Sequence, residues 1–156
     1  VFSSRAVEAS AKDVLKRKIV GKERPQLKRS ENGELEEELR RRLRSLMWRR
    51  VGIIREGEGL QEALAELRQI NSETERLARS GLNERSIELR NMVTVGELIA
   101  RAAFTRKESR GTHYRRDYPR RDDLNWRRHI ILRRDFSDMV AVTRTDVPLG
   151  RRKAGN

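Results

Sequence analysis

Residues 34–70, ELEEELRRRLRSLMWRRVGIIREGEGLQEALAELRQI, carry the pattern that decides the fold. In the first half, apolar residues recur at steps of three and four: Leu35, Leu39, Leu43, Leu46 and Met47. After three glycines, at positions 52, 57 and 59, the same spacing returns at Leu60, Ala63, Leu64, Leu67 and Ile70. This spacing places each set on one side of an α-helix. The stretch therefore predicts two amphipathic helices, the first ending near Arg50, that pack as an antiparallel hairpin.

A third helix is predicted directly after this pair. Ser80 and Gly81 end the second helix, and Asn83 is a residue type that caps helix N-termini. Its apolar stripe is expected at Ile87, Met92, Val95, Ile99, Ala102 and Ala103. The small Ala102 and Ala103 would let a neighbouring helix approach closely. The predicted fold class is mainly α: a three-helix bundle over residues 34–106, followed by a C-terminal extension of loop and short strands.

The two flanking segments are less regular than the bundle. Residues 1–33 are expected to form a loosely helical segment and then a loop around Gly21 and Pro25. Residues 107–156 form the C-terminal extension, in which HIILRRDF (129–136) and MVAVTRTDV (139–147) are short enough to be strands. Residues 150–156 read as a polar tail.

Composition narrows the functional classes. The chain has 156 residues, no cysteine, 39% charged residues and a formal charge of +13. Absence of cysteine excludes disulfides and thiolate metal sites, and no apolar run reaches the roughly 20 residues that span a bilayer. We therefore expect a cytoplasmic chain without membrane insertion. A basic nucleic-acid-binding helical module is one alternative, but arginines on solvated helix faces explain the charge more simply, so nucleic acid is not the expected partner.

No self-contained catalytic, cofactor-binding or metal site is predicted. The clustered glycines lack the strand, loop and helix context of a dinucleotide fingerprint. His113 and His129 lack the spacing of zinc ligands and are expected to be hydrogen-bonded packing residues. Asp117, Asp122 and Asp123 lie among arginines, where ion pairing keeps carboxylates ionised and poor as general acids.

Residues 113–129, HYRRDYPRRDDLNWRRH, interleave aromatic residues with arginines. Stacking on Tyr114, Tyr118 and Trp126 together with phosphate contacts would suit single-stranded nucleic acid. The acidic residues that alternate with the arginines weaken the positive electrostatic field that would attract phosphates. Burial of the aromatic rings with arginine–carboxylate bridges is the simpler interpretation.

Two segments resemble a known family: MWRRVGIIREGEGLQEALAEL (47–67) and NMVTVGELIARAAFTRKESRGTHYRRDYPRRDDLNWRRH (91–129). They are similar to the C-terminal region of the succinate dehydrogenase, fumarate reductase and L-aspartate oxidase flavoproteins. The most specific part is S-R-G-x-H-x-R-x-D-[YF]-P, which matches Ser109, Arg110, Gly111, His113, Arg115, Asp117, Tyr118 and Pro119. The resemblance covers most of residues 1–135.

The resemblance implies a bundle packed beside FAD-binding and capping domains, which would be its partners. L-aspartate oxidase, which converts L-aspartate to iminoaspartate in NAD biosynthesis through quinolinate, is the favoured member. A succinate dehydrogenase or fumarate reductase flavoprotein subunit is the alternative. FAD is implied for the full-length enzyme, but the family's flavin motif and substrate-binding residues lie upstream, so this chain alone should be inactive. Arg110, His113 and Arg115 are a candidate interdomain clamp, or order the turn after the third helix.

Overall fold

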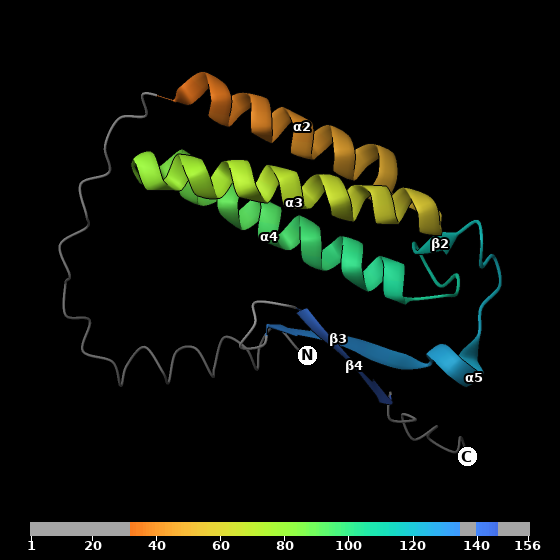
Figure 1. The fold of residues 1–156 in the computed structure, drawn as a ribbon. Coiled ribbons are helices and arrows are strands. Elements are labelled where there is room, and N and C mark those ends of the chain that lie inside the picture. The colour runs from red at the N-terminus through yellow and green to blue at the C-terminus, as the bar shows by residue number, and fades with distance from the viewer. Residues whose placement is uncertain (1–31, 135–139, 147–156) are drawn as a thin grey trace, which may run out of the picture.

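A computed structural model describes residues 32–134 and 140–146. Three long helices form a bundle: α2 (Gly33–Val51), α3 (Gly57–Ser80) and α4 (Glu84–Thr105). They lie side by side, with consecutive helices antiparallel (Figure 1). The mainly α fold with a small strand extension is thus confirmed. The helical segment and most of the loop predicted over residues 1–33, and the tail at 150–156, lie outside the described residues.

The core lies between the three helices. It contains most of the predicted stripe of α2 and the whole predicted stripe of α3, together with residues of α4: Leu39, Leu43, Leu46, Val51, Leu60, Ala63, Leu64, Leu67, Ile70, Leu77, Leu89, Val93, Ala100 and Ala103. Leu35 is an exception, because it is 41% exposed at the first turn of α2.

The predicted core face of α4 is only partly right: Ala103 is buried and Met92 packs against the core, but other predicted residues do not. Ile87, Val95 and Ile99 are exposed, and the helix instead buries the side that carries Leu89, Val93 and Ala100. Gly96 explains why this side of α4 is buried: a Cβ added there would lie 3.3 Å from Met47 Sδ and 3.4 Å from Leu67 Cδ2. A face with glycine and alanine lets α2 and α3 approach together, whereas branched side chains would hold them apart.

The start of α4 agrees with the prediction. Asn83 Oδ1 accepts from the backbone N–H of Ser86 at 2.9 Å, and Ser86 Oγ accepts from the backbone N–H of Asn83 at 3.0 Å, which together form a capping box. Asn83 Nδ2 also donates to Glu36 Oε1 of α2 at 2.7 Å. The cap therefore joins two helices as well as starting one.

The C-terminal extension folds back on the end of the bundle. The two-residue strand β1 (Ile54–Arg55), in the α2–α3 connection, pairs in parallel with β2 (Tyr114–Arg115). After the short helix α5 (Asp123–Trp126), β3 (Arg128–Arg134) and β4 (Val140–Asp146) form an antiparallel hairpin with Arg128 opposite Asp146. The predicted strands are thus confirmed. Among the described residues, no helix has both the length and the apolar character needed to cross a membrane.

Candidate functional site

Arg115 is the centre of the S-R-G-x-H-x-R-x-D segment. Only 2% of it is exposed, and its Nη1 donates to the backbone oxygens of Ala103, Phe104 and Arg106 at 2.9, 3.1 and 3.2 Å. These carbonyls end α4, where a helix has unpaired acceptors and a partial negative charge. The guanidinium therefore caps the C-terminus of α4.

Asp117 extends this cap to α3. Its carboxylate accepts two hydrogen bonds from Arg115, one from Nε at 2.8 Å and one from Nη2 at 2.6 Å. Oδ2 also accepts from the backbone N–H of Gly57 at 3.1 Å. Gly57 is the first residue of α3, so the carboxylate lies at the positive end of that helix. One ion pair thus satisfies a helix C-terminus and a helix N-terminus. A Cβ on Gly57 would lie 2.9 Å from Asp117 Oδ2, so a side chain there would displace the carboxylate.

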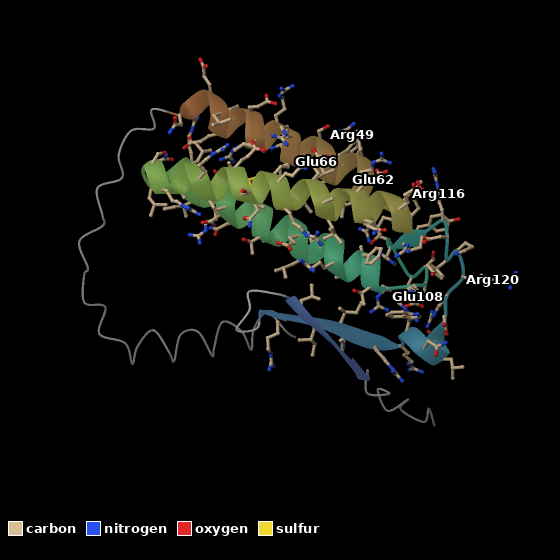
Figure 2. The ribbon with its side chains drawn as sticks, in the orientation of Figure 1. Arg49, Glu62, Glu66, Glu108, Arg116 and Arg120 are labelled. Atoms are coloured by element: carbon tan, nitrogen blue, oxygen red, sulfur yellow. The ribbon has the colours of Figure 1, made fainter. Side chains whose placement is uncertain are left out.

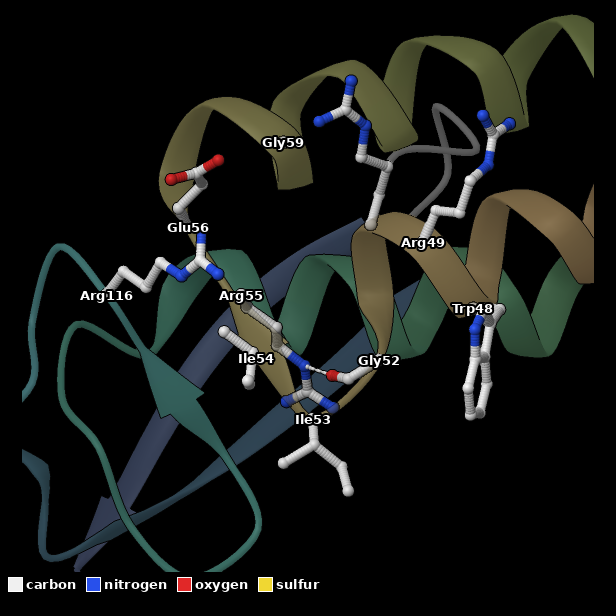
Figure 3. Close-up of a pocket in the computed structure, with 10 residues that line it drawn as sticks. Trp48, Arg49, Gly52, Ile53, Ile54, Arg55, Glu56, Gly59 and Arg116 are labelled. Carbon is white, nitrogen blue, oxygen red and sulfur yellow. Dashed lines mark hydrogen bonds between the residues drawn. The ribbon is translucent and has the colours of Figure 1, made fainter.

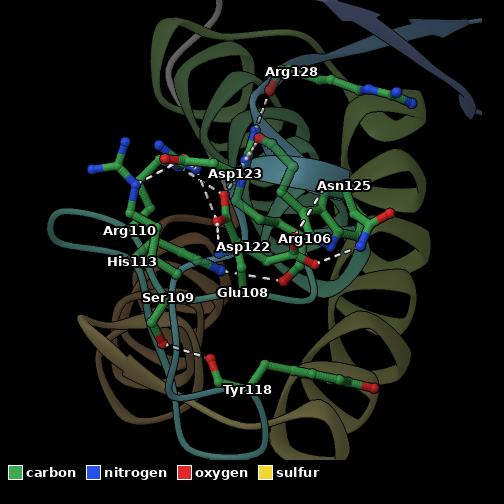
Figure 4. Close-up of polar contacts among 12 residues, drawn as sticks. Arg106, Glu108, Ser109, Arg110, His113, Tyr118, Asp122, Asp123, Asn125 and Arg128 are labelled. Atoms are coloured by element: carbon green, nitrogen blue, oxygen red, sulfur yellow. Dashed lines mark hydrogen bonds and ion pairs between the residues drawn. The ribbon is translucent and has the colours of Figure 1, made fainter.

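Glu108 is the second buried charge, with no exposed surface. Oε1 accepts from Arg106 Nη1 at 2.7 Å and from Arg110 Nε at 2.8 Å, and Oε2 accepts from Arg110 Nη2 at 3.0 Å and from the backbone N–H of Asp122 at 2.9 Å (Figure 4). Burial opposes ionisation, but these hydrogen bonds hold the pKa of Glu108 below its usual value. Figure 2 shows Glu108 between the end of the bundle and α5.

Arg106 and Arg110 connect Glu108 to α5 and extend the network of charged side chains around Arg115 and Glu108. Arg106 donates to the backbone oxygens of Trp126 and Arg128 at 2.9 and 2.6 Å, and its guanidinium lies 5.8 Å from the centre of the buried Trp126 ring. Arg110 Nη2 reaches Asp123 Oδ1 at 2.5 Å. Hydrogen bonds from Arg121 and Arg110 lower the pKa of Asp123 to about 2.

His113 lies between arginines. Arg55 Nη1 is 2.6 Å from His113 Nδ1, so Nδ1 must accept, and Nε2, 3.3 Å from the backbone oxygen of Arg106, must donate. Burial lowers the pKa of His113, and the charges of Arg55, Arg115 and Arg106 act in the same direction although the bond to the carbonyl of Arg106 opposes it. The ring is therefore neutral near pH 7. Arg55 Nε in turn caps α2 at the carbonyls of Val51 and Gly52, at 3.2 and 2.5 Å.

The network holds no group ready for acid–base chemistry. Glu108, Asp117, Asp122 and Asp123 all have lowered pKa values, because each accepts hydrogen bonds, so none is a proton donor near neutral pH. Both nitrogens of His113 are engaged. Within residues 32–134 and 140–146, no cluster of histidine and carboxylate residues could hold a metal ion.

Arg110, His113 and Arg115 do fall in one place, as the sequence predicted. Their described contacts lie within this chain, and their role, as an interdomain clamp or in ordering the turn after α4, stays a prediction. Sequence reasoning missed Arg55, Arg106 and Glu108. The available signal was a carboxylate within two residues of three basic residues in the segment RKESR (106–110), but burial of a charge is set by the fold. His129, by contrast, is exposed on β3.

A pocket of about 550 Å³ opens beside this network, at the α2–α3 connection (Figure 3). Its lining includes Trp48, Gly52, Arg49, Arg55 and Arg116. The strand β1 followed by Gly57-x-Gly59 superficially suits a nucleotide phosphate. However, the N-terminus of α3 already holds the carboxylate of Asp117, which would repel a phosphate. The N-terminus of α3 is therefore not free to bind a phosphate.

The comparisons with known proteins agree with this geometry. Residues 40–153 match the family described as "Fumarate reductase flavoprotein C-term", so the chain belongs to that family. It is 49% identical over 78 residues to L-aspartate oxidase of Acinetobacter baylyi, covering 49% of this chain and 14% of that protein. It is 36% identical over 107 residues to the succinate dehydrogenase flavoprotein subunit of Coxiella burnetii, covering 62% and 18%.

The fold also occurs in solved flavoprotein structures. A quinol-fumarate reductase solved with menaquinol superposes with a TM-score of 0.67 at 25% identity, over 95% of this chain and 25% of that chain. The described chain thus corresponds to a domain of flavoprotein subunits that contain other domains, and it spans a quarter or less of these relatives.

Proposed function

We propose that this chain is the C-terminal helical domain of an FAD-dependent L-aspartate oxidase. The full-length enzyme would remove two electrons and two protons from L-aspartate to give iminoaspartate, as a cytoplasmic step of NAD biosynthesis. FAD would bind to the upstream domains. This domain would have a supporting role, because its charged network contains no reacting group.

The degree of similarity carries the proposal. Identity to the Acinetobacter baylyi L-aspartate oxidase is 49%, against 36% for the Coxiella burnetii succinate dehydrogenase subunit. L-aspartate oxidases of Rhodospirillum rubrum and Yersinia pestis are both 46% identical over about the same length. The segment LRNMVTVGELIARAAFTRKESRGTHYR (89–115) also looks more like L-aspartate oxidase than like the respiratory flavoproteins.

A succinate dehydrogenase or fumarate reductase flavoprotein subunit is the second candidate. One observation favours it: the flavoprotein chain of a quinol-fumarate reductase superposes over 95% of this chain with a TM-score of 0.67. The two candidates differ in substrate. The supporting role of this domain is the same in both.

Purified full-length protein distinguishes the candidates. We expect bound FAD, and we expect L-aspartate with oxygen to yield hydrogen peroxide and iminoaspartate in equal amounts. Succinate with an artificial electron acceptor is the matched assay for the alternative. Turnover of succinate without turnover of L-aspartate would replace the first candidate by the second, and absence of flavin would contradict both.

A further inference from the structure

We infer that the surface around Trp48, at the α2–α3 connection, is a docking site for an acidic segment of a separate protein that carries an apolar anchor side chain. The Trp48 surface is defined here as Trp48, Arg49, Ile53, Ile54 and Arg116. These residues line the pocket of about 550 Å³ described above. The inference goes beyond the proposed function and is the same for either candidate enzyme.

The apolar part of the Trp48 surface is exposed to solvent. Trp48 is 83% exposed, Ile53 64% and Ile54 56%. Trp48 and Ile53 project on the same side of the connection (Figure 3). An isolated exposed apolar residue, such as Leu124 at 86%, is normal on a protein surface, whereas a group of them marks an interaction site. Because the three side chains line one pocket, they form such a group.

The described fold does not depend on these side chains. Trp48 lies outside the core cluster that contains Leu46 of the same helix. The connection is held by the backbone and by Arg55: the backbone oxygen of Ile53 accepts from the N–H of Tyr114 at 3.2 Å, and Arg55 Nε donates to carbonyls at the end of α2. Substitution of Trp48 should therefore leave the bundle intact.

Arginines surround the apolar group. Among the described residues that line the pocket, four are arginines and one, Glu56, is acidic. Two of the arginines are already engaged within the chain, because Arg50 pairs with Glu62 at 2.8 Å and Arg55 donates to backbone carbonyls. The charge of the other two arginines is available to a partner.

Arg49 and Arg116 are these two arginines. Neither forms an ion pair with a residue that the structure describes, and Arg49 contacts the backbone oxygen of Ser45 at 3.4 Å. They lie at opposite ends of the pocket in Figure 3, with Ile53 and Ile54 between them in that view. A guanidinium binds carboxylates through paired, charge-assisted hydrogen bonds. Carboxylates on both sides of an apolar side chain would therefore match this surface.

A protein partner fits these residues better than other occupants. Tryptophan and arginine are enriched among the few residues that dominate binding at protein interfaces. Nucleic acid would stack its bases on aromatic rings, and Ile53 and Ile54 offer none. A second copy of this chain, with a formal charge of +13, lacks the excess of acidic residues that would complement the arginines.

A peptide-binding experiment with the full-length protein tests the inference. The probe is a fluorescein-labelled peptide of about ten residues in which glutamates flank a central Leu-Phe pair. One control peptide has Ser-Ser in place of Leu-Phe, and the other has lysines in place of the glutamates. At 150 mM salt we expect a dissociation constant of about 10–100 μM for the probe, as a small transient interface gives, and at least about tenfold weaker binding of both controls. Absence of probe binding, or equal binding of the Ser-Ser peptide, would overturn the inference.

Matched variants of the full-length protein locate the site. Trp48→Ser should weaken binding of the probe at least about tenfold, because it removes the central aromatic contact. Leu124→Ser, which removes an exposed apolar side chain elsewhere, should leave binding unchanged. Equal losses in the two variants would contradict a site at Trp48.

Charge is tested in the same way. Arg49→Ser combined with Arg116→Ser should weaken binding at least about tenfold. Arg44→Ser combined with Arg79→Ser removes the same charge from two exposed positions outside the Trp48 surface and should change binding less than about twofold. Equal losses in the two double variants would show that the peptide responds only to net charge, and the inference would then be wrong.

Labelling of position 48 shows whether the surface is already covered. In the full-length Trp48→Cys protein, maleimide should react at about the same rate in native protein as in urea. Slow labelling of the native protein, or benzophenone cross-links to upstream residues or to a second copy, would overturn the inference. Tighter binding of a single-stranded oligonucleotide, lost in the same variants, would do so as well. None of these readouts uses substrate turnover, so the docking site and the proposed oxidase activity can fail independently.

Discussion

Arg115 shows how a single buried charge holds several elements together. A buried guanidinium is costly unless its hydrogen bonds are made, and here three carbonyls and one carboxylate accept from it. Tyr118 adds a ring 5.1 Å from the guanidinium. Because the accepting groups come from α4 and the following loop, and Asp117 binds α3, removal of one side chain affects three parts of the fold.

Arg115→Ala should lower the free energy of unfolding by about 3 kcal/mol, since it leaves Asp117 and the end of α4 without a donor. Urea denaturation followed by circular dichroism would measure the change. Arg116→Ala is the control: this neighbour is exposed, and its loss should cost less than about 0.5 kcal/mol. Equal effects of the two variants would show that Arg115 has no special role.

His113 should make stability depend on pH. Its pKa in the folded protein lies below the ordinary value of 6.5, because of burial first and then the charges of Arg55, Arg115 and Arg106. The unfolded chain therefore binds the proton more readily, so the contribution is fully present above about pH 6.5 and is lost as the pH falls toward the folded pKa. The lowered pKa values of Glu108 and Asp117 act at lower pH.

Unfolding measured from pH 7.5 to 5 would test this prediction. The protein should lose stability below about pH 6.5, whereas His113→Gln, whose amide cannot titrate, should show a flatter profile over the same range. Parallel profiles for the two proteins would mean that His113 does not titrate in the way its surroundings require.

The α2–α4 contact illustrates how an element is positioned by its terminus. Asn83 begins α4, and the same side chain donates to Glu36 of α2, whose carboxylate is only 3% exposed. The second oxygen, Oε2, has no hydrogen-bond partner among the residues that the structure describes. The carboxylate therefore depends on Asn83 for its described hydrogen bond, and the start of α4 is fixed against α2.

Asn83→Ala should consequently cost more than an ordinary cap, about 2–3 kcal/mol against roughly 1, because it also leaves a buried carboxylate without a partner. Thermal or urea unfolding would measure it. In a Glu36→Leu background, the same substitution should cost only about 1 kcal/mol, the value of the cap alone. An unchanged cost in that background would show that the Asn83–Glu36 bond contributes nothing.

At the scale of the whole molecule, many basic residues of the described part of the chain lie in ion pairs. Several arginines connect helices through ion pairs, among them Arg42 with Glu73, Arg50 with Glu62 and Arg90 with Glu75. Exposed pairs of this kind each contribute only about 0–1 kcal/mol. Figure 2 shows acidic side chains such as Glu62 and Glu66 among the basic ones of α2 and α3, so acidic residues interrupt the basic surface.

Nucleic acid should therefore bind weakly and without sequence preference. With a formal charge of +13, we expect dissociation constants of about 1 μM or weaker at 150 mM salt, rising steeply with salt as counterions are released. Fluorescence anisotropy with two unrelated duplexes at 50, 150 and 300 mM salt would measure this. Nanomolar binding of one duplex at 150 mM salt would instead support the nucleic-acid-binding alternative.

Local sequence patterns determined the elements of this protein. The spacing of leucines in residues 34–70 predicted α2 and α3, and Asn83 predicted the start of α4, because helix periodicity and capping depend on neighbours a few residues apart. The S-R-G-x-H-x-R-x-D segment also singled out Arg110, His113 and Arg115, whose role stays a prediction. The resemblance of that segment to the flavoprotein family is confirmed by the family match.

Tertiary structure alone decided which face of α4 is buried and which charged side chains are paired or buried. Two sides of α4 are apolar, so periodicity cannot predict which side is buried. The buried side is the one with Gly96, where side chains of α2 and α3 approach the helix closely. Arg55 and His113 meet across 58 positions, and Gly57 and Asp117 across 60. Such contacts depend on how the extension returns to the bundle, and local sequence carries no information on that path. Burial of Glu108 is likewise a consequence of the elements that surround it.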